Sequence, residues 1–467
     1  MNRLTHMICV SMIVCSMYGK ESGAVQIGQN GLGEVLIYPY YTVNNNLNTL
    51  YSIVNTTDQA KAINVRFQEG EFGHDVLSFH VYLSAFDVWT GALAAVDSTI
   101  SGHFNEPSVL HLTSDTSCAP FLTKSGQEFL PFLLDLDGSN DNLLRAREGQ
   151  LKVFEMGVLT GEAAAAVDHQ GVGIPSDCGL IETEWVDNGV WDLDDLDAPS
   201  GGLMGSATIV NVFEGLALPY DAIALQNFWQ QSGFHAEPGS EEPNLSSAFP
   251  ESKILIDNGE LAVSEWANGY EAVSAVLMNT FIHNEYVLDT LVNGKSEWVV
   301  SFPTKKFHTV SDADVKAPFS RIWNGQVSCD EYELDIYDRE EQLEIITTVG
   351  VGGLPRPSVP IFCYSSNVLE FVLPGMTSNV SSAVLGSNNN FQESTPANAV
   401  TESGWARLSF TNPQFRMNPS NGANLLGLPL VGFAVQQFTN AGAAEGLLAQ
   451  YGSLFMHKSS SVVETGQ

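Results

Sequence analysis

Positive charge is scarce in this chain. Its 467 residues include 19 lysines and arginines against 54 aspartates and glutamates, so the formal net charge is −35 at pH 7. The phosphates of nucleic acids and the headgroups of anionic membranes would repel such a protein. The excess of carboxylates suits a protein that stays soluble at high concentration or one that binds divalent cations. An acidic solvated surface without a ligand explains the same charge equally well.

The sequence also lacks the short motifs of common catalytic sites. It contains no GxSxG nucleophile elbow, no HExxH metal motif, no GxxxxGK[ST] phosphate loop and no GxGxxG after a strand. A carboxylate pair of the glycosidase type leaves no such trace, because its spacing is set by the fold. We therefore assign no catalytic residues and no cofactor motif, and we interpret the chain as a protein that is not an enzyme.

Long apolar runs are missing beyond the first residues. Residues 7–17 form an apolar stretch that follows Arg3 and precedes the small residues Ser22, Gly23 and Ala24. This arrangement is typical of a secretory signal peptide, which we predict at residues 1–24. No other segment approaches the 18 apolar residues of a membrane-spanning helix, so we expect no transmembrane helix in the mature chain. The predicted location is secreted, at the cell surface or extracellular.

Cysteine is rare, and the number of cysteines indicates how many disulfides the chain can form. Two of the six cysteines lie in the predicted signal peptide, which leaves four. An even number in an exported chain predicts two disulfides, with three possible pairings. The absence of CxxC spacing argues against a zinc site. Proximity in the sequence favours the pairs Cys118–Cys178 and Cys329–Cys363.

The pattern of apolar residues indicates β-strands over most of the chain. Apolar and polar residues alternate over residues 63–67 and again over residues 77–84, which places alternate side chains on opposite faces of a sheet. Asn-rich and Thr-rich segments between the runs favour turns. We therefore predict a mainly β fold built of antiparallel β-sandwich domains, with a short helical segment in the middle of the chain.

The predicted domains follow from where this pattern changes. Apolar residues at helical spacing occur over residues 220–229 and, more strongly, over residues 270–291. Between the strands of the two halves they suggest a helical insertion at about 217–292. We expect an N-terminal sandwich at 25–215, a second β-rich domain at 216–460 that contains this insertion, and a flexible tail at 461–467. In an alternative arrangement, the last strands close the first sheet.

Two acidic loops are the candidate metal sites. Asp135, Asp137 and Asp141 surround Gly138, and carboxylates at alternate positions beside a glycine can surround a hard cation. The loop is similar to the DxDG calcium loops of exported proteins, although it lacks the distal glutamate of a full EF-hand loop. Asp192 and Asp194 belong to a second, weaker cluster. Calcium is the expected ion, and a solvated acidic turn is the alternative at both places.

Three segments carry a family resemblance. The chain resembles a family of exported, uncharacterised Gram-negative bacterial β-rich proteins in these segments. They are residues 33–43 (GEVLIYPYYTV), residues 201–212 (GGLMGSATIVNV) and residues 298–309 (WVVSFPTKKFHT). The resemblance covers most of the mature chain and implies no catalytic residues. The composition is also similar, more weakly, to that of surface-layer proteins.

Three hypotheses of function follow. The first is a secreted structural protein of the cell surface that assembles with itself, as in a surface layer or biofilm matrix, with calcium as a helper. The second is an adhesin that binds cell-surface glycans through exposed tryptophans, eight of which are spread along the chain; filling of sandwich cores is the competing explanation for these residues. The third is a secreted hydrolase with a carboxylate pair.

Overall fold

The computed structural model describes residues 23–464 with gaps. The gaps are at 172, 187–189, 192–194, 230–234, 257–258, 311–314, 341–342, 345–347, 350–354, 357–359, 374–379, 396–401 and 441–448. Residues 1–22 of the predicted signal peptide therefore lie outside the described part of the chain.

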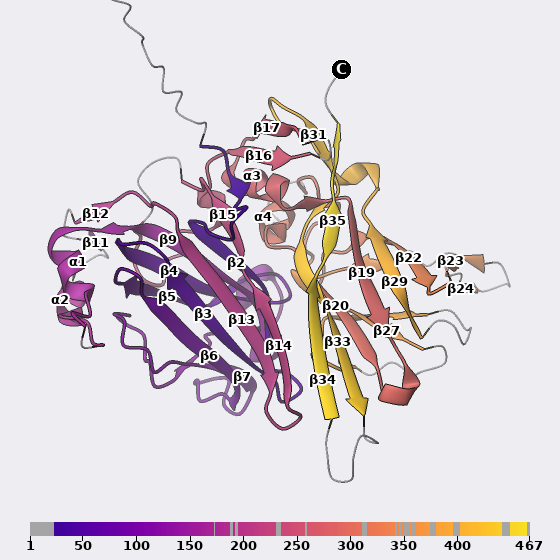
Figure 1. The fold of residues 1–467 in the computed structure, drawn as a ribbon, viewed down its shortest axis with the longest axis horizontal. Coiled ribbons are helices and arrows are strands. Elements are labelled where there is room, and N and C mark those ends of the chain that lie inside the picture. Colours follow the sequence, from indigo (N-terminus) through magenta and orange to yellow (C-terminus); the bar gives the residue numbers. More distant parts are fainter. Residues whose placement is uncertain are drawn as a thin grey trace, which may run out of the picture.

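The N-terminal half folds into a sandwich of two antiparallel sheets (Figure 1). Sheet 1 contains, in spatial order, β1 (Gln26–Ile27), β15 (Ile223–Gln226), β2 (Val35–Thr42), β9 (Glu148–Leu159), β4 (Ala60–Glu69) and β5 (Asp75–Leu83), with β12 (Leu196–Asp197) beside β9. Sheet 2 contains β14 (Leu216–Asp221), β13 (Leu203–Asn211), β3 (Asn48–Asn55), β6 (Val88–Asp97), β7 (Pro107–Leu112) and β8 (Gln127–Glu128). Two short helices, α1 (Gly161–Val167) and α2 (Cys178–Thr183), pack on one end of the outer face of sheet 1.

The alternation in the sequence places the core as expected. Ile63, Val65 and Phe67 of β4 and the odd-numbered residues 77–83 of β5 are buried between the two sheets. The intervening polar residues are buried as well, which alternation alone does not indicate. Arg66, for example, donates from Nη2 to the carbonyl of Ser240, 2.6 Å away, because the segment after β15 covers the outer face of sheet 1.

The C-terminal half forms a second sandwich. Sheet 3 contains β23 (Leu343–Glu344), β22 (Glu333–Asp338), β29 (Ser403–Ser409), β19 (Phe281–Val287) and β35 (Lys458–Ser460). Sheet 4 contains β28 (Asn390–Ser394), β27 (Ser366–Val372), β20 (Lys295–Ser301), β33 (Val431–Asn440) and β34 (Ala449–Met456). The pair β27 and β28 is parallel, and the other neighbours in these two sheets are antiparallel. The predicted mainly β fold with antiparallel sandwiches is therefore confirmed.

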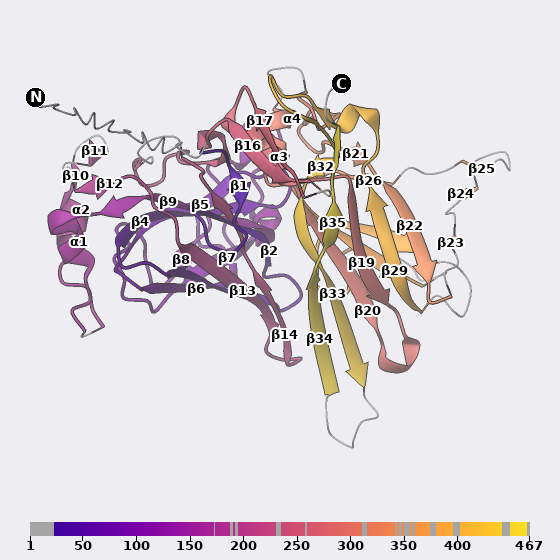
Figure 2. The same cartoon turned by 45° about the horizontal axis from the view of Figure 1, so that its top comes forward.

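Shorter elements complete the structure. Four elements lie at the top of the molecule between the sandwiches, namely β16 (Glu251–Leu255), β17 (Leu261–Glu265), α3 (Gly269–Val276) and α4 (Lys305–Thr309) (Figure 2). The small ladders are β10 (Trp185–Val186) with β11 (Val190–Trp191), β18 (Met278–Asn279) with β32 (Leu428–Pro429), β21 (Asp330–Glu331) with β26 (Ile361–Phe362), β24 (Thr348–Val349) with β25 (Pro355–Arg356), and β31 (Asn424–Leu426) between β30 (Arg416–Met417) and β36 (Val462–Glu464). Strand β36 covers residues 462–464 of the predicted tail at 461–467, and these three residues pair with β31.

The predicted helical insertion at about 217–292 is largely wrong. Residues 216–226 form strands β14 and β15, so the N-terminal sandwich extends beyond residue 215. The predicted helix at 270–291 is helical only in α3 and continues as strands β18 and β19. Ile282 and Tyr286 are both buried, and a separation of four residues satisfies helical and strand spacing alike. Pro219, within the edge strand β14, suits such a strand better than a helix.

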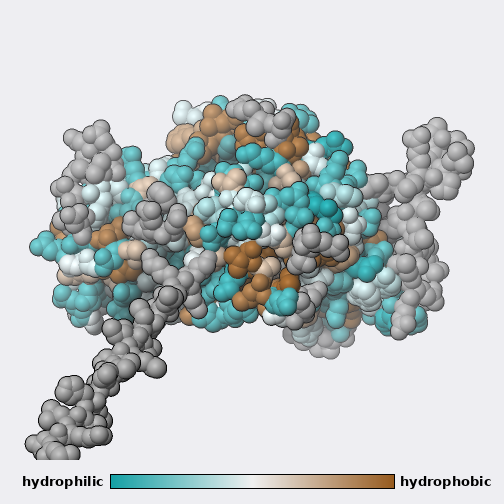
Figure 3. Space-filling model, turned by 90° about the horizontal axis from the view of Figure 1, so that it is seen from above, coloured by the Kyte–Doolittle hydropathy of each residue, from teal (hydrophilic) through white to brown (hydrophobic). Residues whose placement is uncertain are grey.

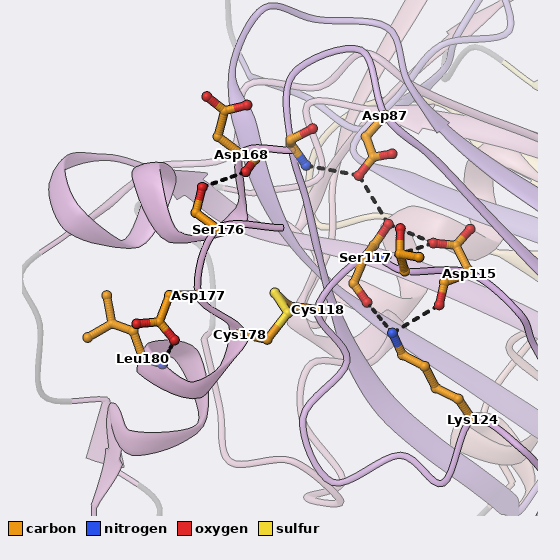
Figure 4. Close-up of a disulfide and its surroundings, with 12 residues drawn as sticks. Asp87, Asp115, Ser117, Cys118, Lys124, Asp168, Ser176, Asp177, Cys178 and Leu180 are labelled. Carbon is orange, nitrogen blue, oxygen red and sulfur yellow. Dashed lines mark hydrogen bonds between the residues drawn. A yellow bond between two sulfur atoms is a disulfide. The ribbon is translucent and has the colours of Figure 1, made fainter. Parts of the chain in front are cut away.

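Both disulfides are present, in the pairing that sequence proximity favours. The Cys118–Cys178 bond joins the loop between β7 and β8 to helix α2, and the Cys329–Cys363 bond joins residues next to β21 and β26. Figure 4 shows the first of them beside Asp177, which caps α2 by accepting a hydrogen bond from the Leu180 amide, 3.1 Å away. Cys118 and Cys363 are buried, and the second disulfide flanks the ladder of β21 with β26. Among the described residues, no helix is long and apolar enough to cross a membrane.

The hydrophobic core of the N-terminal sandwich extends onto the outer face of sheet 4, while the C-terminal sandwich also has a core of its own. Val299, Val368, Phe433 and Val435 project from the outer face of sheet 4 and belong to the same buried cluster as the N-terminal core. The ring of Phe433 lies 5.0 Å from that of Tyr220 on β14. Continuous apolar packing across the boundary holds the halves in a fixed relation.

Candidate functional sites

A buried charge cluster lies at the junction of the sandwiches. Arg145 donates from Nε to Glu69, at 3.0 Å, and from Nη2 to Asp137, at 2.7 Å. The side chains of all three residues are at most 2% exposed. Burial by itself would raise the pKa of Glu69, but the guanidinium of Arg145 outweighs it and lowers that pKa. Glu69 also accepts backbone N–H groups from residues 71–74, so it is fully partnered.

The first predicted calcium loop lies beside this cluster. Asp137 accepts hydrogen bonds from Arg145 and from the Ser139 amide. The positive charge beside its buried carboxylate is therefore the guanidinium of Arg145. Asp141 is 61% exposed and lies 3.6 Å from His103 Nε2. Asp135 is exposed at the start of a short 3₁₀ turn. Among the described residues, no group of three or more His, Cys, Asp or Glu side chains is arranged to hold a metal ion.

The second acidic cluster is described only in part. Asp192 and Asp194 lie outside the described residues. Their neighbour Asp195 accepts the backbone N–H groups of Glu162, at 2.7 Å, and of Ala163, at 3.3 Å. These groups begin helix α1, so Asp195 satisfies otherwise unpaired donors at the helix start.

A second buried carboxylate connects the two sandwiches. Glu148, at the start of β9, accepts hydrogen bonds from Tyr40 Oη at 2.7 Å, Ser387 Oγ at 2.6 Å and the Asn388 amide at 2.8 Å. Tyr40 belongs to sheet 1, whereas the other two donors lie in the loop 382–389 that precedes β28 of sheet 4. The same loop is held from sheet 4 by Glu297, which accepts from the amides of Val384 and Leu385. Burial raises the pKa of both glutamates, and that of Glu297 reaches about 7.

Glu148 and Glu71 also line a small polar cavity. Burial raises the pKa of Glu71 to about 7, so two carboxyl groups of shifted pKa face one space, which is the arrangement that a hydrolase would need. The cavity has a volume of about 120 Å³, whereas ligand pockets usually measure some 300–1,000 Å³. Both oxygens of Glu148 are already hydrogen-bonded. The geometry therefore favours a structural role for this pair.

A buried serine–histidine pair was not indicated by the sequence. Ser274 Oγ on α3 lies 2.9 Å from His308 Nε2 on α4, the separation of a nucleophile and its base. Both side chains are at most 1% exposed, and Ser274 Oγ also contacts Tyr270 and Thr304. Without solvent access, the pair joins α3 to α4 and has no route to a substrate. Burial lowers the pKa of His308 to about 3.

This histidine gives a testable pH dependence. The unfolded chain protonates His308 near pH 6.5, whereas the folded protein keeps it neutral, so its contribution to stability is present above pH 6.5 and is lost as the pH falls. We expect the loss of stability caused by His308→Gln to shrink by about 2 kcal/mol between pH 7 and pH 5, measured by urea unfolding. Between pH 7 and pH 8 the loss should stay nearly constant. An unchanged loss from pH 5 to pH 8 would contradict a neutral buried imidazole.

The tryptophans are mostly internal. Trp89 and Trp298 are fully buried, and Trp405 on β29 is 38% exposed. The ring of Trp405 stacks on Tyr337, with centroids 4.3 Å apart, and His283 lies 6.0 Å from it on the next strand. Its two faces are thus directed at protein rings, which leaves mainly an edge for contact with a sugar.

An open groove lies on the outer face of sheet 2. It has a volume of about 670 Å³ and runs over β13, β3, β6 and the loop after β7. Gly91 forms part of its floor, because a Cβ there would lie 2.4 Å from the buried ring of Tyr51. The lining is apolar or hydroxyl-bearing, with one lysine and no carboxylate. It consists of Leu50, Tyr51, Ser52, Thr90, Gly91, Ala92, Leu112, Thr113, Ser114, Lys124, Ser125, Ser206, Ala207 and Thr208.

A second groove lies at the top of the molecule. Figure 3 looks onto this side, where hydrophobic patches lie among hydrophilic residues. The groove measures about 460 Å³ and includes Ile27, Leu255 and Leu261, which are 40–58% exposed. It lies beside Val25, which forms a bridge with Ser252 near the start of the described chain.

Comparisons of this chain with protein-family models, with curated proteins and with solved structures found no match, so the function has to be argued from these surfaces alone.

Proposed function

We propose that this protein is a non-catalytic, exported structural protein that associates with itself at the cell surface through the outer face of sheet 2. The observation that carries the proposal is the carboxylate-free groove of about 670 Å³ on that face. In a chain of net charge −35, most surfaces of two copies repel each other. A lining of hydroxyl and apolar side chains allows close approach without that repulsion.

The chemistry of the groove suits a protein partner. Leu50 is 44% exposed, and Val88 and Met204, on the strands that carry the groove, are 42% and 43% exposed. Met204 and Val88 flank Val54 in one row across the strands, and Leu50 lies on the same face beyond Ser52. Apolar groups gathered on a sheet face among polar ones are typical of protein contacts. Serine and threonine hydroxyls at the same place can hydrogen-bond a partner backbone without introducing charge.

The remaining acidic surface gives divalent cations a secondary role. Repulsion between two carboxylate-rich faces is screened by salt and is reduced further by bound calcium. Calcium would then promote assembly without a dedicated site in the part of the chain described. The N-terminal core that extends onto sheet 4 and the Glu148 contacts fix the two sandwiches together, as a building unit of constant shape requires.

The test is self-association of the whole protein. We expect sedimentation velocity to show concentration-dependent oligomers, and Ala92→Glu, which places a carboxylate in the groove, to reduce them to monomer. Ala95→Glu is the matched control, since it makes the same change on the same strand outside the groove lining. Chelation with EDTA should weaken assembly only partly. A wild-type protein that stays monomeric at high concentration, with or without calcium, would refute the proposal.

A further inference from the structure

The hairpin that ends sheet 2 carries an exposed aromatic tip. Strands β13 and β14 are joined by residues 212–215, at the lower rim of the molecule in Figure 1. Val212 is 76% exposed and Phe213 is 85% exposed. Hairpin turns usually contain Gly, Asn or Asp, which fit the turn backbone, and Gly215 meets that need here with φ of +68°. The turn itself therefore gives no reason for two large apolar residues.

The base of this tip is held firmly. Asn211 accepts a hydrogen bond from the Glu214 amide at 3.1 Å and donates to the carbonyl of Asn45 at 3.2 Å. The Glu214 carboxylate accepts from Gln450 Nε2 at 2.9 Å. Phe213 is thus presented on a fixed support, and an ordered aromatic side chain loses little conformational entropy when it is buried.

The tip cannot fill the groove of its own chain. Ser206 and Thr208 of β13 line the groove, and β13 continues in register with β14 to Asn211. From Thr208 to Phe213 the strand rises about 3.4 Å per residue, which places the tip on the order of 17 Å from the groove lining. An occupant of the groove that comes from this hairpin must therefore belong to another copy.

The two surfaces carry opposite charges and both expose apolar groups. The groove offers Leu50 and Leu112 for contact with an aromatic ring, and Lys124 is its one charged residue. The tip offers Phe213 with Glu214 next to it. We propose that the β13–β14 tip of one copy inserts Phe213 into the sheet 2 groove of a second copy. This inference rests on the self-association proposed above and names the segment that makes the contact.

The contact has a structural consequence. Tip and groove are different surfaces, so each copy can give one contact and receive another. Such a heterologous interface closes into a ring or reciprocal pair, or it extends as a filament. Both outcomes suit a structural protein of the cell surface.

The test compares three variants of the full chain with wild type by sedimentation velocity, after circular dichroism has shown that each is folded. Phe213→Ser should raise the apparent dissociation constant by about 30-fold or more, as is typical for an aromatic hot spot. Phe104→Ser is the matched control, because Phe104 is 71% exposed in another loop and should leave association unchanged. Ala92→Glu blocks the groove.

Mixing separates this inference from the proposal on which it rests. Phe213→Ser keeps an intact groove and Ala92→Glu keeps an intact tip, so each alone should be monomeric and the mixture should form a one-to-one pair. If Phe213→Ser associates like wild type while Ala92→Glu does not, the groove contact stands and the tip is excluded. A mixture of two monomeric variants that forms no pair also overturns the inference. If neither variant changes association, the proposed function fails as well.

Discussion

Replacing Arg145 with methionine should lower the free energy of unfolding by about 3–5 kcal/mol, one of the two largest effects that we expect from a single substitution. Arg145 is the shared partner of Glu69 and Asp137, whose side chains are 0% exposed. Methionine fills a similar volume but leaves two carboxylates facing each other without a cation. The protein must then protonate them, admit water or lose the local fold, and each response costs stability.

The matched control for this prediction is Arg416→Met. Arg416 lies 2.8 Å from Glu464, but both side chains are 40% exposed. Exposed ion pairs contribute about 1 kcal/mol or less, so this variant should behave almost like wild type in urea unfolding at pH 7. Equal, small losses for the two variants would mean that water reaches the Arg145 cluster, which would contradict its burial.

The sequence predicts those parts of the fold that depend on local alternation. Residues 63–67 and 77–83 specify their inward faces because a register shift of one residue would turn every apolar side chain to the other face of the sheet. The disulfides follow from a count of four cysteines and their proximity. The helix expected at 270–291 fails because Ile282 and Tyr286 fit both spacings, and sheet 3 pairs this segment with β29 through contacts that no local pattern encodes.

The candidate sites depend on contacts between distant segments, and these could not be predicted. The sequence predicts Asp137 to be a cation ligand, but the fold places Arg145 beside it and brings both residues to Glu69. The groove on sheet 2 is visible only once β13 lies next to β3, 150 residues earlier. One feature of the sequence does indicate buried charge. Arg66 and Lys152 interrupt apolar strands in a chain with few basic residues, and both are buried in the structure.

The second large effect is expected at the junction of the sandwiches. Glu148→Ala removes the acceptor of three hydrogen bonds, and two of the donors, the hydroxyls of Tyr40 and Ser387, are buried. An unsatisfied buried donor costs about 1–3 kcal/mol, so we expect a loss of about 2–6 kcal/mol in the free energy of unfolding. Glu333→Ala, an exposed glutamate on β22, should change it little.

Hydrogen exchange locates this effect within the loop 382–389. The Asn388 amide donates to Glu148, whereas the amides of Val384 and Leu385 donate to Glu297, on the other sandwich. In Glu148→Ala the Asn388 amide should therefore exchange much faster, while the two amides bound to Glu297 keep most of their protection. Uniform acceleration across the loop would mean that the two carboxylates act as one unit. Unchanged exchange at Asn388 would mean that Glu148 does not hold the sandwiches together, because the contact from sheet 1 to this loop would then persist without its acceptor.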